Sequence, residues 1–420
     1  MPDVRIPTDE ELRWLTKRAV AEIVPEKELI GALKSGRHLR IKMGFDPTRP
    51  VITLGWAVGM RKLRQFQDLG HTVVVIVGDW TARIGDPSGK SETRPMLDEE
   101  EVRANSEAIF EQFFKILDPA RTEIRRQTEW FNDFTLTDVV RIAAKFTVAQ
   151  IMERDDFSNR FSANEPIGLH ELLYPLLQGY DSYAIASDVE FGGTDQKFNN
   201  LVGRELQRTL GQEAGPAGQG QAVLLVPLIV GTDGVKKMSQ SLDNFIAIND
   251  EPNDMYGKLM SIPDDVIVDY FTLLTDVPDA ELAEISLSIR ERTVNPRDQK
   301  MRLAREIVGQ FHGEAEAQAA EQAFVQTFSE GKLPDEVPEA VVSFKAGLAE
   351  APAEADGMVR LTWLLRSLDM APSNSEANRL INGRAVEIDG EVAGPAVALR
   401  DGMVVRVGKH RFVRVRNADA

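Results

Sequence analysis

Five short stretches of the sequence hold polar side chains that could bind a small molecule or a phosphate. In one of them, Tyr174, Gln178 and Asp181 are three or four residues apart, which places them on one side of a helix. A phenol, an amide and a carboxylate on one helix side are typical of a pocket, although a solvated helix face is the commoner cause of such a pattern. The other four stretches lie where loops are expected, at 44–48, 85–91, 192–197 and 234–241.

Two of these loops have positions that suit a nucleotide. Residues 44–48 follow a strand-like run, and open α/β sheets bind ligands at the carboxyl ends of their strands, so Asp46 and Thr48 are candidate substrate contacts. Residues 85–91, Gly-Asp-Pro-Ser-Gly-Lys-Ser, are similar to a P-loop, but three residues rather than four separate the glycines. The spacing alone therefore indicates a polar turn.

The remaining two loops are ambiguous when each is considered alone. Asp195 and Gln196 follow a pair of glycines, which is most simply a glycine turn. Lys236 and Lys237 lie in a flexible basic loop that could reach a phosphate. A lysine pair in a loop is usually solvated surface, so charge alone does not decide between the two interpretations.

The elements that must position these residues alternate between strands and helices in the first half of the chain. Residues 40–45 and 72–77 predict strands, and the β-branched run in the second is typical of a strand buried on both faces. Helical patterns cover 55–69, 99–115 and 136–154. A strand–helix–strand order predicts a parallel sheet, so the expected class is α/β with a Rossmann-like nucleotide-binding domain.

The chain divides into four expected segments. We predict the Rossmann-like domain with a helical insertion over 1–235, a helical domain over 236–330, a linker rich in Pro, Ala and Glu over 331–356, and a small α+β module over 357–420. In the last segment, Ser373 and Glu376 are spaced as in a capping box at a helix start. Strand-like runs follow at 385–388 and 403–407.

The composition excludes several classes of protein. The 420 residues include no cysteine, and the five histidines lack metal-binding spacing, so disulfides, cysteine nucleophiles and protein-built zinc sites are not expected. Neither a membrane span nor a secretory signal is visible, which favours a cytoplasmic protein. The net charge of −17 argues against general nucleic-acid binding, but residues 357–420 hold ten Arg or Lys against seven Asp or Glu. That segment could bind a polyanion, and a mildly basic surface is an equally good explanation.

In their order and intervals, the five stretches together resemble those of bacterial tyrosyl-tRNA synthetases, which are class I aminoacyl-tRNA synthetases. The resemblance covers nearly the whole chain, and the blocks at 85–94, 174–181 and 192–199 are specific to the tyrosyl branch. It implies an enzyme that activates tyrosine with ATP and Mg²⁺ and transfers it to tRNA(Tyr). It also implies a homodimer, with apolar helix faces within 110–161 available for pairing, anticodon binding by the helical domain and RNA binding by the final module.

The resemblance assigns roles to the matching residues. Asp181 would accept the phenol hydroxyl, which explains rejection of phenylalanine, because the buried acid would then be left unpaired. The ammonium and backbone of tyrosine would be held by Asp86, Tyr174, Gln178 and Gln196. The residues expected near the phosphates or ribose of ATP are Asp46, Thr48, Lys90, Arg94, Asp195, Lys237 and Ser239.

Both class I signatures are altered in this chain. The His-x-Gly-His signature reads Thr53-Leu54-Gly55-Trp56, so both histidines are absent, and Gln240 replaces the second lysine of Lys-Met-Ser-Lys-Ser. Losing one transition-state donor typically costs roughly 3–4 kcal/mol, so losing several would slow activation on the order of 10⁴-fold or more. Further unusual choices close to the same segments are Val51, Met60, Tyr183, Ala186 and Asn200. We expect Val51, Trp56 and Met60 to make the nucleotide end smaller and more apolar.

Three interpretations of these changes remain open on the sequence. The first is a working tyrosine–tRNA ligase. The second is a pocket, remodelled by divergence or redesign, that binds a small aromatic or apolar ligand without activating it. The third is a different reaction that recruits Thr53, Tyr183 or Asn200.

Overall fold

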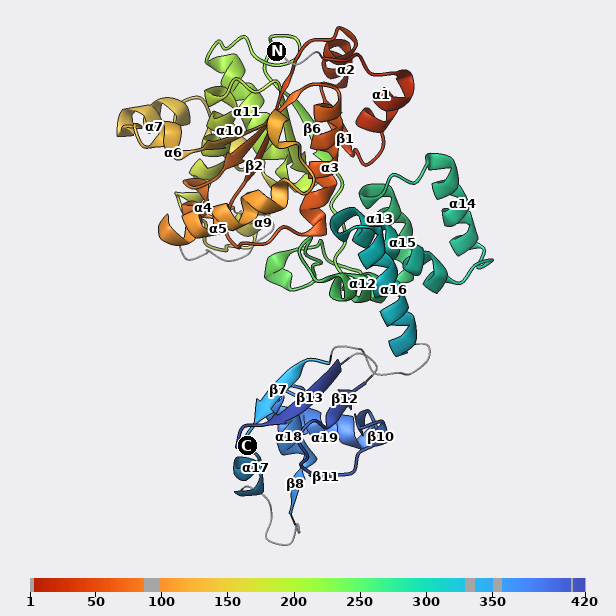
Figure 1. Ribbon diagram of the computed structural model, residues 1–420. Helices are drawn as coiled ribbons and strands as arrows, with labels where there is room; N and C mark the ends of the chain where they lie inside the picture. Colours follow the sequence, from red (N-terminus) through yellow and green to blue (C-terminus); the bar gives the residue numbers. More distant parts are fainter. Residues whose placement is uncertain (1–3, 87–98, 329–336, 350–356, 409–410, 420) are drawn as a thin grey trace. The chain divides into compact units, whose positions relative to one another are not determined.

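The computed structural model describes residues 4–86, 99–328, 337–349, 357–408 and 411–419. The chain forms two compact units, Met1–Gln318 and Ala319–Ala420 (Figure 1). Among the described residues, no helix combines the length and the apolar character needed to cross a membrane.

The first unit is built on a six-stranded sheet in the order β1-β6-β5-β2-β3-β4. Neighbouring strands are parallel except β1 and β6, which are antiparallel, so the predicted parallel sheet is confirmed. The apolar runs of β3 and β6 are buried along almost their whole length, as strands covered on both faces require. The strands are β1 Glu22–Val24, β2 Arg40–Phe45, β3 Thr72–Val77, β4 Thr122–Arg126, β5 Val189–Gly193 and β6 Ala222–Val226.

The direction of chain progression through this sheet reverses beside β2. β3 and β4 follow on one side of β2, and β5 and β6 lie on its other side. The carboxyl ends of β2 and β5 therefore flank a topological switch point, which is where open α/β sheets bind their ligands. Asp46 follows β2 and Asp195 follows β5, so the fold brings these two candidate loops to the same edge of the sheet.

Helices cover both faces of the sheet (Figure 1). On one face, Phe113 of α5 contacts Phe45 of β2, and Phe66 of α3 contacts Phe191 of β5, both edge to face. The pair α10 and α11 covers the other face, where Ile185 packs on β3. Outside the insertion between β4 and α10, the helices before β6 are α1 Asp9–Thr16, α2 Glu26–Lys34, α3 Leu54–Asp68, α4 Thr81–Ile84, α5 Glu99–Phe113, α10 Tyr174–Ala184 and α11 Lys197–Thr209.

The helical insertion between β4 and α10 differs in one place from the sequence expectation. The single helix predicted over 136–154 is instead two helices, α7 and α8, because Thr147 begins a new capping box. Its Oγ1 accepts a hydrogen bond from the backbone N of Gln150 at 3.2 Å, and Gln150 Oε1 accepts from the backbone N of Thr147 at 2.8 Å. The insertion comprises α6 Thr128–Phe131, α7 Leu136–Ala143, α8 Val148–Ile151 and α9 Asp155–Ser162.

Residues 252–328 are almost entirely helical, as the sequence patterns indicate. α12 and α13 contact α15, and α13 also contacts α3 beside the large sheet. The helical region expected over 236–330 therefore belongs, as far as Gln318, to the same compact unit as the large sheet. The helices are α12 Pro252–Ser261, α13 Ile267–Leu274, α14 Asp279–Arg290, α15 Pro296–His312 and α16 Glu314–Phe328.

The second unit has its own sheet and core. Five strands follow the order β10-β9-β12-β13-β7, and β8 pairs with β11. Its core includes Leu361, Leu364, Val405 and Val415. The strands are β7 Glu339–Val342, β8 Met358–Arg360, β9 Val386–Ile388, β10 Glu391–Val392, β11 Ala396–Ala398, β12 Val404–Val407 and β13 Arg411–Asn417, and the helices are α17 Phe344–Ala349, α18 Leu361–Ser367 and α19 Asn374–Asn382.

The segment expected to be a linker, 331–356, is not a linker throughout. β7 pairs in parallel with β13, and α17 follows it directly. Val342 is buried in the core of the unit, and Phe344 packs against that core. The Pro, Ala and Glu content of the segment concealed this short apolar stretch, whose paired residues in β13 come 75 positions later in the chain.

Candidate active site

Helix α10 carries three of the predicted residues and connects to the loop after β2. The buried Tyr174 donates a hydrogen bond from its hydroxyl to Asp46 Oδ2 at 2.9 Å. Burial and the negative charge of Asp46 raise the pKa of this phenol, so it remains a donor at neutral pH. Tyr174 therefore joins the helix to the edge of the sheet at the switch point.

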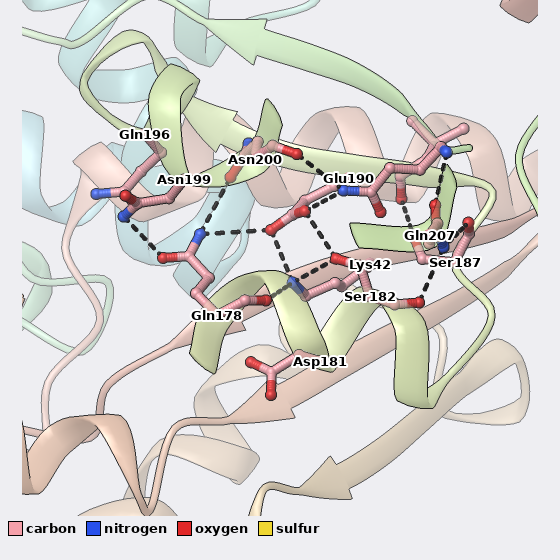
Figure 2. A network of polar contacts seen from close by, with 12 residues as sticks. Lys42, Gln178, Asp181, Ser182, Ser187, Glu190, Gln196, Asn199, Asn200 and Gln207 are labelled. Atoms are coloured by element: carbon pink, nitrogen blue, oxygen red, sulfur yellow. Dashed lines mark hydrogen bonds and ion pairs between the residues drawn. The ribbon is translucent and has the colours of Figure 1, made fainter. Parts of the chain in front are cut away.

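One end of the site is a hydrogen-bonded network around Asp86. Gln196 donates to Asp86 Oδ2 at 2.8 Å. Asn199 Nδ2 donates both to Gln196 Oε1 at 3.1 Å and to Gln178 Oε1 at 2.9 Å (Figure 2). Arg154 contacts Asp86 Oδ1 at 3.1 Å and Asn199 Oδ1 at 3.0 Å. The structure thus brings Asp86, Gln178 and Gln196 together, through two residues that the sequence did not indicate.

The other predicted polar residue of α10, Asp181, is buried and held by two donors. Gln127 Nε2 donates to Oδ2 at 2.8 Å, and Trp130 Nε1 donates to Oδ1 at 3.1 Å. Burial raises the pKa of Asp181 to about 7, although the ammonium of Lys42 and the Gln127 hydrogen bond both lower it. Gln127 is fixed in turn, because its Oε1 accepts from the backbone N of Thr81 at 2.9 Å.

Open space lies beside this part of the sheet. Lys42 and Gly44 alternate along β2 and therefore face the same side of the sheet. Lys42 is buried, whereas Gly44 is exposed, and a Cβ atom on Gly44 would meet no heavy atom within 4 Å. A side chain there would fill this space, so glycine keeps the sheet face free.

The loop after β2 is held from both sides. Thr81 donates to Asp46 Oδ1 at 2.7 Å, and the backbone N of Thr48 donates to the carbonyl of Asp46 at 2.8 Å. Gly78 permits the close approach of the carboxylate, because a Cβ atom there would lie 2.1 Å from Asp46 Oδ1. From α5, Gln112 accepts from the backbone N of Ile52 at 2.9 Å, which anchors the end of the loop.

The loop after β6 brings another pair of predicted residues together. Lys237 and Asp195 form an ion pair at 2.6 Å between Nζ and Oδ2, although they are 42 residues apart in sequence. The backbone N of Ser239 donates to Asn244 Oδ1 at 2.9 Å, and its hydroxyl contacts that of Ser241 at 2.9 Å. Lys237 is therefore placed at the carboxyl end of β5, next to the switch point.

The altered signature positions contact one another. Thr53 is only 2% exposed and precedes α3 without capping it, while the ring of Trp56 packs edge-on against Phe45 with centroids 6.2 Å apart. Gln240 donates from its side chain to the carbonyl of Val51, and Arg49 donates to the carbonyl of Gln240 at 3.0 Å. Gly55 lies against Ile229 and Met238, since a Cβ atom there would be 3.6–3.7 Å from their side chains.

Several other predicted positions are placed differently from expectation or are not described. Met60 is completely buried within α3, and its expected effect on the nucleotide end stays a prediction. Asn200 is buried with its side-chain amide 3.1 Å from Gln178 Nε2, whereas the ring of Tyr183 packs against Tyr180. Ala186 has a left-handed backbone, with φ of 49°. Two of the predicted phosphate contacts, Lys90 and Arg94, lie outside the described residues.

The sequence did not indicate Gln127, Trp130, Arg154 or Asn199 as site residues. Asn199 lies three residues after Gln196 at the start of α11, so helix spacing could have identified it. Arg154 and Trp130 come from the insertion, and their sequence surroundings carry no signal for a site at the sheet edge.

Comparison of the fold identifies the class of protein. A family model described as tRNA synthetases class I (W and Y) matches residues 34–329. A solved mitochondrial tyrosyl-tRNA synthetase from Aspergillus nidulans, truncated at its C-terminus, aligns with a TM-score of 0.61 at 21% identity, covering 76% of this chain and 99% of that one. The Archaeoglobus fulgidus tyrosyl-tRNA synthetase complexed with L-tyrosine aligns with a TM-score of 0.60 at 23% identity, covering 74% and 99%. At these identities the similarity establishes the fold, which is that of a class I tRNA synthetase.

Closer relatives define the branch within that class. The tyrosine–tRNA ligase of Thermotoga maritima is 49% identical over 98% of this chain and 99% of its own length. That of Dehalococcoides mccartyi strain 195 is 48% identical over 95% and 96%. The chain belongs to the bacterial tyrosine–tRNA ligases, as its motifs indicated.

Proposed function

We propose that this chain activates tyrosine with ATP and transfers the tyrosyl group to tRNA(Tyr), with an activation step slowed by the altered signatures. The observation that carries the proposal is the pair of polar ends joined by α10. Asp86, Gln178 and Gln196 are hydrogen-bonded together at one end, and the buried Asp181 stands at the other. The end around Asp86 suits an ammonium group, and Asp181 suits a phenol hydroxyl.

Tyrosine binding follows from the chemistry of the two ends. The ammonium group would donate to the carboxylate of Asp86 and to the side-chain oxygens of Gln178 and Tyr174. The phenol hydroxyl would donate to Asp181, and the ring would lie in the open space beside Gly44. Phenylalanine would leave Asp181 without its partner, which is the basis for its rejection.

Activation requires the tyrosine carboxylate to attack the α-phosphate of ATP. A carboxylate oxygen forms the new bond to phosphorus while the bond to pyrophosphate breaks, and the protein contributes positioning and charge stabilisation. Lys237 supplies a positive charge, and Asp46, Thr48 and Asp195 line the sheet edge where the nucleotide would lie. A ribose hydroxyl of tRNA(Tyr) then attacks the tyrosyl carbonyl carbon, and AMP leaves.

Mg²⁺ would enter with the phosphates of ATP. In the part of the chain that the structure describes, no group of three or more His, Cys, Asp or Glu side chains is placed to hold a metal ion. The phosphate oxygens themselves are suitable ligands for Mg²⁺, which usually keeps several waters when it binds at such sites.

At the signature positions, which the structure describes, the nucleotide end lacks the imidazoles and the second ammonium that would help to stabilise the developing charge. Thr53 is buried, and Trp56 packs against Phe45, so neither presents a cationic or donor imidazole. Gln240 is neutral and its amide is already engaged with Val51. We therefore expect adenylate formation to be slow, although tyrosine binding should be intact.

Charging of tRNA(Tyr) in a prolonged incubation tests the proposed function. The expected product is tyrosyl-tRNA, formed slowly and only with tyrosine among the aromatic amino acids. Charging with a different amino acid would contradict the proposal. Tyrosine binding without any charging after hours would favour the interpretation of a binding protein. The relatives described above give no support for a different reaction, since each is a tyrosine–tRNA ligase.

We also propose a homodimer that pairs through the helical insertion. Five large apolar side chains in this region are between 59% and 82% exposed: Leu136, Val140, Val148, Phe161 and Leu169. Leu136 and Val140 are four residues apart on α7, so they lie on one face of the helix. An apolar surface of this kind in a soluble enzyme marks an interaction site.

Negative charges introduced on the apolar face of α7 should separate the subunits. We expect Leu136→Glu with Val140→Glu to convert a dimer to a monomer at micromolar concentration, because two carboxylates would have to be desolvated in the interface. Sedimentation velocity measures the change, and Leu287→Glu on α14 is the control, since that exposed leucine lies outside the insertion. A wild-type monomer, or a double variant that remains dimeric, would rule out this surface.

The second unit is proposed to bind tRNA, and the helices of 252–328 are proposed to contact its anticodon region. The proposed location of the protein is the cytoplasm. Because β7 belongs to its sheet, a truncation that removes the whole sheet should start at residue 337 rather than at 357. We expect this truncation to weaken tRNA(Tyr) binding and to reduce its salt dependence, since the net positive region is lost. Binding titrations at several salt concentrations measure both quantities, and equal salt slopes for the two proteins would remove the unit from the RNA interface.

A further inference from the structure

A buried ion pair joins the two central strands beneath helix α10. Lys42 of β2 and Glu190 of β5 are directly opposite in the parallel register, and their Nζ and Oε1 atoms are 2.7 Å apart (Figure 2). Their side chains are 0% and 1% exposed. The pair lies at the topological switch point, two residues before the exposed Gly44 on the same face of β2.

All three donors of the Lys42 ammonium are used within the protein. Besides Glu190, it donates to the carbonyl of Gln178 and to the hydroxyl of Ser182, each at 2.9 Å. Ser182 in turn donates to Glu190 Oε2 at 2.9 Å, and Gln221 donates to the same oxygen. Lys42 therefore holds two points of α10, one turn apart, and has no donor left for a ligand.

We propose that the Lys42–Glu190 pair is a positioning device for tyrosine specificity, which fixes α10 on the sheet so that Gln178 and Asp181 meet the two ends of tyrosine. This inference rests on the proposed function, because it takes tyrosine as the substrate. Neither residue contacts the substrate, so both act through α10 and through Asp181.

The contacts of Gln178 link this device to the ammonium end. Its carbonyl is held by Lys42, and its side chain contacts Asn199 at 2.9 Å, Asn200 at 3.1 Å and Glu190 at 3.4 Å. A buried ion pair is weak evidence for a role in stability, because an apolar pair of similar volume is often as stable. A role in fixing the position of α10 therefore explains this pair better than a role in stabilising the sheet.

The charges around Asp181 link the same device to the phenol end. Lys42 from β2 lowers the pKa of Asp181, Glu190 from β5 raises it, and Gln127 and Trp130 donate to its carboxylate from the segment after β4. An ionised carboxylate accepts the phenol hydroxyl more strongly than a protonated one. Tyrosine affinity should therefore rise with pH as Asp181 loses its proton, and the two members of the pair should move that transition in opposite directions.

Tyrosine titrations between pH 5.5 and 8.5 test the proposal in full-length protein. Lys42→Met should weaken binding roughly tenfold or more at neutral pH and move the midpoint of the pH dependence upward by about one unit. Glu190→Gln, which keeps the shape of Glu190 and removes its charge, should move the midpoint downward. The double variant Lys42→Met with Glu190→Gln should leave the midpoint near that of the wild type while tyrosine affinity stays reduced, because α10 loses its tether. ATP affinity should be unchanged in all three.

Arg64→Met is the control, because Arg64 is a cation on α3, on the opposite face of the sheet from α10, and is paired with Asp68 at 2.8 Å. It should leave both the midpoint and the affinity for tyrosine unchanged. Thermal unfolding of every variant shows which are folded. Midpoints that move in the same direction in Lys42→Met and Glu190→Gln, or that do not move in folded variants, would overturn the inference while leaving the proposed function intact. A wild-type chain that does not bind tyrosine would remove the proposed function and this inference together.

Discussion

Restoring both class I signatures at once, with Thr53→His, Trp56→His and Gln240→Lys, is expected to raise the rate of tyrosine activation by several orders of magnitude. Each change supplies a donor or a charge where the triphosphate would lie, and one preorganised donor is typically worth about 10²–10³-fold in rate. The changes belong together in space as well, because Gln240 contacts the carbonyl of Val51, just before Thr53. Exchange of pyrophosphate into ATP in the presence of tyrosine measures the rate.

Single substitutions are expected to have small effects. Groups that act on one transition state are not additive, so one restored group gains little without the others. Thr53 is also buried, so a histidine there needs its neighbours to move. Arg64→His on the exposed side of α3 adds an imidazole away from the site and serves as the control. A folded triple variant that binds tyrosine but exchanges no faster than the wild type would disprove this explanation of the slow step.

Replacing Asp181 by asparagine is expected to remove most of the preference for tyrosine over phenylalanine. Sites built around a hydrogen bond to a substrate hydroxyl discriminate by about 10⁴–10⁵-fold, and the loss of a charged acceptor removes much of that ratio. The variant should remain folded, because the substitution also removes the desolvation cost that raises the pKa of Asp181 to about 7. The unfolded carboxyl group titrates near 3.8, so this cost is absent below that pH, grows as pH rises from 3.8 to about 7, and is constant above it. Asp181→Asn should accordingly raise the free energy of unfolding above pH 7 and change it little below pH 4.

Dissociation constants for tyrosine and phenylalanine, measured by calorimetry, give the discrimination directly. Asp79→Asn is the matched control, since burial also raises the pKa of Asp79 but its partner is Thr128. Asp79→Asn should retain the wild-type ratio of the two constants. An Asp181→Asn protein that still binds tyrosine far more tightly than phenylalanine would show that another group recognises the phenol.

The sequence was sufficient for features that depend on local spacing. Tyr174, Gln178 and Asp181 share a helix face through their three- and four-residue intervals, and α10 begins at Tyr174. The strands at 40–45 and 72–77 follow from buried β-branched and apolar runs, and Ser373 caps α19 as its spacing from Glu376 indicated. Each of these signals lies within one element, where periodicity and capping chemistry determine the structure.

Features that depend on distant partners were not predictable in the same way. The role of Lys42 depends on Glu190, 148 residues later, and a lone lysine in a strand pattern gives no sign of burial. Gln127 and Arg154 reach Asp181 and Asp86 only because the insertion folds back over the carboxyl ends of the strands. β7 was assigned to a linker because its partner, β13, is at the end of the chain. In each case the missing information is which residues the tertiary fold brings into contact.

Formation of tyrosyl-adenylate in a single turnover, with enzyme in excess over ATP, tests the central claim most directly. We expect tyrosine to be the amino acid activated, at a rate several orders of magnitude below the range of about 1–10³ per second that is usual for enzymes. This result would agree with a complete tyrosine end and a nucleotide end that lacks its imidazoles and one ammonium. An ordinary rate would contradict the account, because Thr53, Trp56 and Gln240 would then support the chemistry as well as the residues they replace.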